Sequence, residues 1–119
     1  MDEIRILVED TDSFFERALS AARRIEAGDL APQPATYSLH SVEALFSLLT
    51  SNRWELLRTL RGTGRSSIRA LSKALGRDYR GVHSDVTVLL NAGLIEKDSA
   101  GRIHVPWSKI TAEMVFDTP

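Results

Sequence analysis

The feature that most constrains this chain is a change in hydrophobic period at Gly93. Between about residues 50 and 92, apolar side chains recur every three or four positions, and glycines divide this stretch into three segments. That spacing predicts amphipathic helices. After Gly93, apolar and polar residues alternate in two short runs, 94–97 and 102–105, which predicts a β-hairpin around residues 98–101.

Residues able to cap a helix precede each of the three helical segments. A side-chain oxygen just before a helix can accept hydrogen bonds from the free N–H groups of its first turn. The expected caps are Thr50 for a helix to about Arg61, Ser66 or Ser67 for one that Gly76 ends, and Asp78 for one spanning Tyr79 to Ala92. Three helices followed by a hairpin, over about residues 50–106, predict a winged helix-turn-helix.

The part of the chain before residue 50 is less regular. Residues 4–8 are rich in β-branched side chains and predict a short strand. Ser13 to Glu16 resembles a capping box, so we expect a helix over 13–27. A further strand is expected over residues 35–39, and Ser41 can cap a helix that follows it.

These elements suggest how the chain is organised. Residues 29–34 include two prolines and predict a linker. We therefore expect an N-terminal strand and helix extension at 1–31, a winged helix-turn-helix domain at 35–110 and a C-terminal tail at 111–119. The expected fold class is mainly α with a small β-hairpin wing.

Charge is distributed unevenly, although the formal net charge is only −1. In residues 1–31, acidic residues outnumber basic residues by eight to four. In residues 53–85, basic residues outnumber acidic residues by eight to three. Since a local field decides whether a polyanion is attracted to a surface, residues 53–85 predict a surface for nucleic acid.

The helix expected at 79–92 is the best candidate reader of DNA. If Val82, Val86 and Leu89 face the core, a rotation of about 100° per residue places Arg80, Ser84, Thr87 and Asn91 on the opposite side, with His83 beside them. An α-helix fits the major groove, where arginine can bind guanine and hydroxyl groups can reach other base edges.

Further cations surround this helix. Arg77 lies at its N-terminal end, Arg65 with Ser66 and Ser67 could hold a phosphate at the start of the preceding helix, and Lys97 and Arg102 flank the hairpin turn. The predicted DNA-binding residues are Arg65, Ser66, Ser67, Arg69, Lys73, Arg77, Arg80, His83, Ser84, Thr87, Lys97 and Arg102.

Catalysis, metal binding and a cofactor are not indicated. The chain has no cysteine, and His40, His83 and His104 are widely separated. We expect Asp85 to orient the helix surface or to pair with an arginine rather than to serve as a metal ligand. No apolar run is long enough to span a membrane and no secretory signal is evident, so we expect a soluble, cytoplasmic protein.

Several segments resemble a known family. They are Leu48-Leu49-Thr50, Leu75-Gly76-Arg77-Asp78, Val82-His83-Ser84-Asp85-Val86, Gly93-Leu94-Ile95-Glu96 and Gly101-Arg102-Ile103-His104-Val105-Pro106-Trp107. Over roughly residues 39–110, the chain resembles a MarR-like winged-helix family of DNA-binding regulators whose members are often paired with toxin genes. The resemblance implies binding of double-stranded DNA by residues around Arg77–Thr87, and an antitoxin role with autoregulation and a toxin partner.

Two alternatives stay open at this level. A winged helix can use the same surface to bind a protein instead of DNA. The N-terminal strand and helix and the C-terminal tail are too small to form a core alone, so they either pair with a second copy to make a homodimer or fold back on their own domain. The acidic N-terminal segment could also dock a basic toxin.

Overall fold

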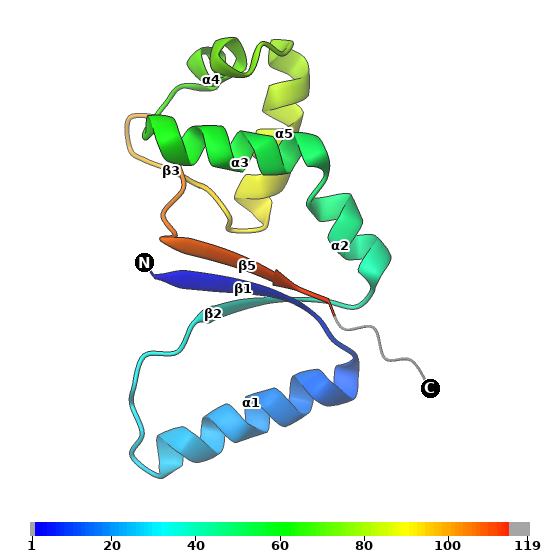
Figure 1. The fold of residues 1–119 in the computed structure, drawn as a ribbon. Helices are drawn as coiled ribbons and strands as arrows, with labels where there is room; N and C mark the ends of the chain where they lie inside the picture. The colour runs from blue at the N-terminus through cyan, green and yellow to red at the C-terminus, as the bar shows by residue number, and fades with distance from the viewer. Residues whose placement is uncertain (1, 115–119) are drawn as a thin grey trace.

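A three-stranded parallel sheet brings the two ends of the chain together. The computed structural model describes residues 2–114. Its sheet has the order β2-β1-β5, with β1 at Glu3–Val8, β2 at Ala35–Leu39 and β5 at Lys109–Glu113 (Figure 1). The central strand β1 pairs in parallel with both neighbours, so that Ile4 lies opposite Ala35 on one side and Ile110 on the other.

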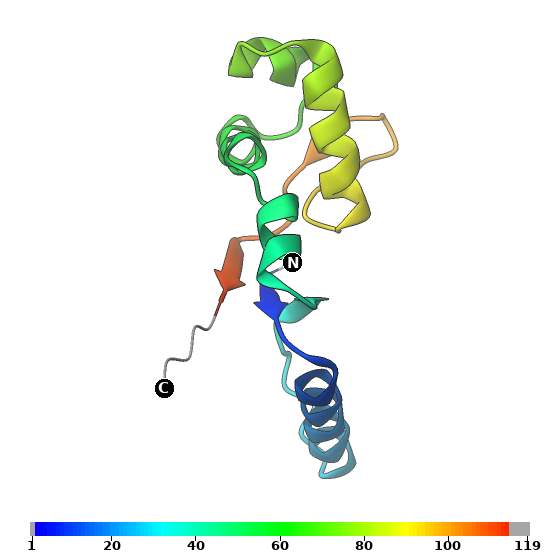
Figure 2. The same ribbon diagram turned by 90° about the vertical axis from the view of Figure 1, so that its right-hand side faces the viewer.

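The two faces of this sheet differ in polarity because alternate residues of a strand point to opposite faces. Ile4 and Ile6 of β1 are buried in the core, and Tyr37 of β2 and Ile110 of β5 pack against that core. Helices α2 to α5 lie on one side of the sheet and α1 lies on the other, as Figures 1 and 2 show. The intervening residue Arg5 belongs to the opposite, more polar face.

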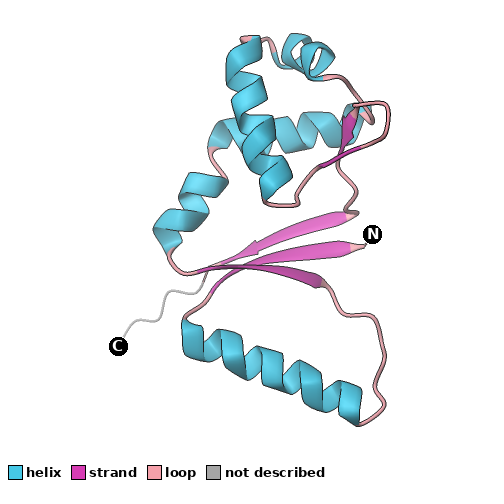
Figure 3. Ribbon diagram, turned by 180° about the vertical axis from the view of Figure 1, so that it is seen from behind, coloured by secondary structure: helices cyan, strands magenta, loops and turns pink. Residues whose placement is uncertain are grey.

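Five helices and a hairpin complete the described part of the chain. The helices are α1 (Thr11–Glu26), α2 (Val42–Leu48), α3 (Ser51–Thr63), α4 (Ile68–Leu75) and α5 (Tyr79–Asn91). Strands β3 (Glu96–Lys97) and β4 (Ile103–His104) form the antiparallel hairpin. In Figure 3 the hairpin lies beside the bundle formed by α3, α4 and α5. No helix within residues 2–114 has the length and apolar character needed to cross a bilayer.

The predicted caps of the helical bundle are confirmed. Thr50, Ser67 and Asp78 accept hydrogen bonds from the backbone N–H groups of Arg53, Ala70 and Arg80, respectively. Side chains from α3, α4, α5 and the hairpin are fully or almost fully buried and form one core: Leu56, Leu60, Leu71, Val82, Val86, Leu89 and Ile103. The helices therefore form where their apolar stripes can pack together.

The ends of the chain differ from the expected organisation. Residues 1–31, expected as an extension, contribute the central strand of the sheet. Residues 111–113, expected within a C-terminal tail, belong to β5, and residues 115–119 lie outside the described part. The strands expected over residues 4–8 and 35–39 are present as β1 and β2, whereas β5 was not expected, so the described residues combine helices with two sheets. Helix α1 also begins earlier than expected, because Asp10 rather than Ser13 is its cap.

Arg17 attaches α1 to the sheet. Its guanidinium donates hydrogen bonds to Glu9, Thr36 and Ser38, and the Arg17 Nη2 to Glu9 Oε1 distance is 2.8 Å. Glu9 also accepts a hydrogen bond from the Ser38 hydroxyl at 2.6 Å. Hydrogen bonds from Arg17 and then Ser38 lower the pKa of the Glu9 carboxyl below its ordinary value of 4.5.

This attachment is expected to weaken in acid. A carboxyl with a lowered pKa stabilises the fold above its ordinary pKa, and that stabilisation is lost as the pH falls through the lowered value. We expect Glu9→Gln to lower the thermal midpoint at pH 7, and the difference from wild type to shrink as the pH falls below the ordinary pKa of 4.5. Thermal melts followed by circular dichroism across this range test it, with the exposed Glu26→Gln as control. A Glu9→Gln difference that is unchanged at low pH would contradict the assignment.

Candidate nucleic-acid interface

Helix α5 has one buried side and one polar, exposed side. Val82, Val86 and Leu89 are buried at no more than 1% exposure. On the outer side, Arg80, His83, Ser84, Thr87 and Asn91 are all exposed. The predicted orientation of this helix is therefore confirmed. The Thr87 hydroxyl donates to the carbonyl of His83 at 3.0 Å, which leaves its oxygen able to accept a further hydrogen bond.

The turn between α4 and α5 sets the direction of α5. Gly76 ends α4 in the left-handed conformation with φ 64°, and its N–H donates to the carbonyl of Lys73. A residue with a Cβ is strained there, so glycine suits the position. Asp78 then caps α5 only two residues later. The short connection holds the N-terminal end of α5 beside α4.

Asp85 on α5 is the centre of a partly buried ion-pair cluster. Its Oδ1 accepts a hydrogen bond from Arg53 Nε at 2.9 Å, and its Oδ2 accepts one from Arg77 Nη2 at 2.8 Å. The Asp85 side chain is 11% exposed. Arg53 also donates to the carbonyls of Ser47 and Leu48 at the end of α2. The cluster therefore ties α5 to the junction of α2 and α3, and the expectation that Asp85 pairs with an arginine is confirmed.

Arg77 consequently differs from the other predicted contact residues. Its side chain is 25% exposed and turns toward Asp85, and its Nη1 atom is buried without a hydrogen-bond partner. Arg80 lies three residues later, in the first turn of α5. It is exposed and forms no ion pair within the described residues. The cation available at the leading end of α5 is therefore Arg80, while Arg77 is bound to Asp85.

Helix α4 brings two more cations next to α5. Arg69 and Lys73 are exposed. The Arg69 guanidinium lies 5.1 Å from the centre of the Tyr79 ring, and that ring is 5.9 Å from the imidazole of His83. A cation stacked on an aromatic ring keeps its outer N–H groups free for other acceptors. Arg69, Tyr79 and His83 thus form a continuous row between the two helices.

The hairpin is held by Asp98 at its turn. Asp98 accepts hydrogen bonds from the backbone N–H groups of Ala100 and Arg102, each at 2.9 Å, and pairs with Arg65 at 3.0 Å. The hydrogen bond from Arg102, followed by those from Ala100 and Arg65, lowers the pKa of Asp98. Lys97 and Arg102 on either side of this turn remain exposed.

The predicted phosphate pocket at the start of α4 is only partly available. Arg65 is engaged by Asp98 and lies 3.3 Å from Nδ1 of His104. Ser66 pairs with Ile103 and so adds a short segment to the hairpin. Ser67 caps α4 with its hydroxyl. These three residues build the junction between α4 and the hairpin.

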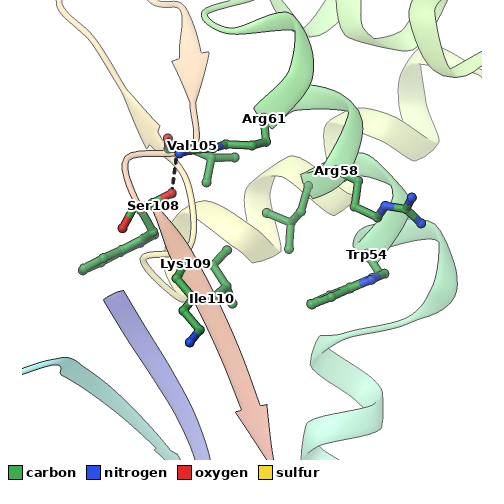
Figure 4. A pocket seen from close by; sticks show the side chains of 9 residues that line it. Trp54, Arg58, Arg61, Val105, Ser108, Lys109 and Ile110 are labelled. Atoms are coloured by element: carbon green, nitrogen blue, oxygen red, sulfur yellow. Dashed lines mark hydrogen bonds between the residues drawn. The ribbon is translucent and has the colours of Figure 1, made fainter. Parts of the chain in front are cut away.

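A separate cavity of about 330 Å³ lies between α3 and the chain leading into β5. Figure 4 shows Trp54, Val105 and Ile110 around it, with Arg58 and Lys109 also labelled. Arg61 donates a hydrogen bond to the carbonyl of Trp107 at 2.7 Å and closes one end. The cavity has apolar walls and a basic rim, and its lining includes no residue of α5.

Within residues 2–114, no group of three or more His, Cys, Asp or Glu side chains is placed to hold a metal ion.

Comparisons with known proteins identify a family. Neither curated proteins nor solved structures gave a significant match. The family model HVO_A0114 matches residues 48–112, which is more than half of the chain and covers α3, α4, α5 and the hairpin. The chain belongs to the HVO_A0114 family.

Proposed function

We propose that this protein is a sequence-specific regulator of transcription that binds double-stranded DNA. In this proposal α3, α4, α5 and the β3–β4 hairpin act as a winged helix-turn-helix, with α5 as the recognition helix. The observation that carries it is the exposed polar side of α5, whose opposite side is fully buried. A helix held in this way offers hydrogen-bonding groups to a groove while its orientation stays fixed by the core.

The outer residues of α5 suit the major groove. Arg80 near the N-terminal end can donate two hydrogen bonds to O6 and N7 of guanine. Ser84 and Thr87 follow on the same side, and their hydroxyls can donate to or accept from base edges. Base contacts by these residues would supply the sequence preference.

Cations on both sides of α5 suit the phosphate backbone. Arg69 and Lys73 extend from α4, and Lys97 and Arg102 extend from the hairpin. They are exposed, and none takes part in an ion pair within residues 2–114. Contacts of this kind fix the position of a protein on DNA and contribute affinity that falls with salt.

The proposal is tested by titrating DNA from upstream of the protein's own gene, and a scrambled duplex of the same composition, in a fluorescence anisotropy assay. We expect tighter binding to the upstream duplex at moderate salt, and binding to both that weakens as salt rises. If the protein binds neither duplex, or binds both equally at every salt concentration, the proposal fails.

The hairpin contributes through charge in this proposal. Replacing both Lys97 and Arg102 with alanine is expected to weaken binding to both duplexes by a similar factor. The slope of log affinity against log salt should fall by roughly two, because two phosphate contacts are lost. A salt series on the double variant measures the slope, with Lys109→Ala as a control away from the hairpin. An unchanged slope would place the hairpin away from DNA.

Binding of a protein by the same surface is the alternative, and the unpaired cations beside α5 favour DNA over it. The antitoxin role, the toxin partner and the cytoplasmic location remain predictions from the sequence.

A further inference from the structure

Helix α1 carries an apolar face that no other part of residues 2–114 covers. Phe15, Leu19 and Ile25 are 58%, 56% and 63% exposed, and no residue of α1 is buried. With Ala18 and Ala22, these side chains share one side of the helix at three- and four-residue spacing. A contiguous apolar stripe of this kind marks an interaction surface in a folded protein.

The side of α1 that faces the sheet is polar instead. Arg17 binds Glu9, Thr36 and Ser38 there. A cavity of about 370 Å³ separates helix and sheet, and its lining includes Arg5, Arg24 and Thr36. Figure 2 shows α1 standing apart below the strands. Because its arginines hold the polar side inward, α1 cannot turn its apolar stripe onto its own sheet without breaking these contacts.

The charges along α1 indicate what covers the stripe. Asp10 and Asp12 lie at its N-terminal end and Glu16 in its N-terminal half, where Arg17 is bound to Glu9. In its last turn the two cations Arg23 and Arg24 outnumber the single acid Glu26. An antiparallel arrangement of two identical helices brings the acidic half of each beside the basic half of the other. A parallel arrangement brings like charges together.

We propose that the apolar stripe of α1 pairs in an antiparallel manner with the α1 stripe of a second copy of this chain. The pairing is isologous, so a two-fold axis crosses the helices near their middle and each favourable charge contact occurs twice. A helix of 16 residues is only about 24 Å long. The interface is therefore small, and we expect a reversible dimer that forms in the micromolar range.

The dimer does not depend on the proposed DNA binding. If both hold, the pairing joins two recognition helices in one particle, and two linked sites bind DNA more tightly than either site alone. The acidic N-terminal half of α1 also disfavours an anionic lipid surface as the occupant of the stripe.

The test is the mass of the full chain, measured by sedimentation velocity over a range of micromolar concentrations. Wild type should shift from monomer to dimer as concentration rises. Leu19→Asp should raise the dimer dissociation constant by roughly a hundredfold, because it places a charge in the middle of the stripe. Phe46→Asp, on an exposed phenylalanine of α2 on the other side of the sheet, should leave it unchanged. Circular dichroism checks that both variants keep their helix content.

Charge reversal tests the orientation of the pair. Arg23→Glu should weaken the dimer by roughly tenfold, because it places like charges beside Asp12 and Glu16 of the other copy. A triple variant with Arg23→Glu, Asp12→Lys and Glu16→Lys should recover it. A monomer at every concentration overturns the proposal, as does a dimer unaffected by Leu19→Asp. Failure of the triple variant to recover the dimer overturns the antiparallel arrangement.

Discussion

Replacing Asp85 with alanine is expected to lower the free energy of unfolding by about 2–3 kcal/mol, which corresponds to a fall of roughly 10 °C in the thermal midpoint. The substitution leaves the guanidinium groups of Arg53 and Arg77 without their shared carboxylate in a site where both are largely buried. One nitrogen of Arg77 already has no partner. An unpaired buried charge costs more than the favourable pairing contributes.

Chemical denaturation of the variant measures this effect. Glu55→Ala is the matched control, because Glu55 is an exposed acid on α3 and its loss should change stability by less than about 0.5 kcal/mol. Asp85→Asn should fall between the two, since its amide oxygen can accept one arginine but carries no charge. If Asp85→Ala unfolds at the same denaturant concentration as wild type, the cluster does not stabilise the position of α5.

Replacing Arg80 with alanine is expected to weaken binding to the preferred duplex by roughly tenfold to a hundredfold, and to weaken binding to scrambled DNA far less. The reason is the exposure of Arg80 at the leading end of α5, where it is the cation best placed to reach a base. The anisotropy titration with both duplexes measures the two effects together.

Two other arginines make this experiment specific. Arg58→Ala removes an exposed arginine that lines the cavity of Figure 4, and should leave DNA affinity unchanged. Arg77→Ala should lower stability through Asp85 and affect DNA binding only secondarily. The role given to α5 is wrong if Arg80→Ala binds both duplexes like wild type, or if Arg58→Ala weakens binding equally.

The parts of the fold that depend on residues close together in the sequence could be predicted. The caps Thr50, Ser67 and Asp78 act within three residues of themselves, and the buried side of α5 follows from its own period. The strands over residues 4–8 and 35–39 were expected, but their pairing in a sheet and its third strand could not be predicted in this way. Its strand β5 is short and only partly buried, and it pairs with β1 from the opposite end of the chain. Nothing local marks such a partner.

The same limit applies to the candidate site. The sequence could place Arg77 at the start of α5, but Arg53 is 32 residues away from the aspartate that it binds. Only the packing of α3 against α5 reveals that one carboxylate holds both arginines. For α1, the apolar period predicts that one side is covered but does not say by which surface.

The position of β1 has a consequence for the order in which this protein matures on the ribosome. Ile4 is made long before its neighbour Ile110, because most of the described chain lies between them. Residues 51–105 contain their own buried core and can fold while synthesis continues. Until β5 is made, one edge of β1 has no partner strand. The unpaired N–H and C=O groups of such an edge can pair with other chains. A nascent chain that stalls before β5 is therefore the species most prone to aggregate.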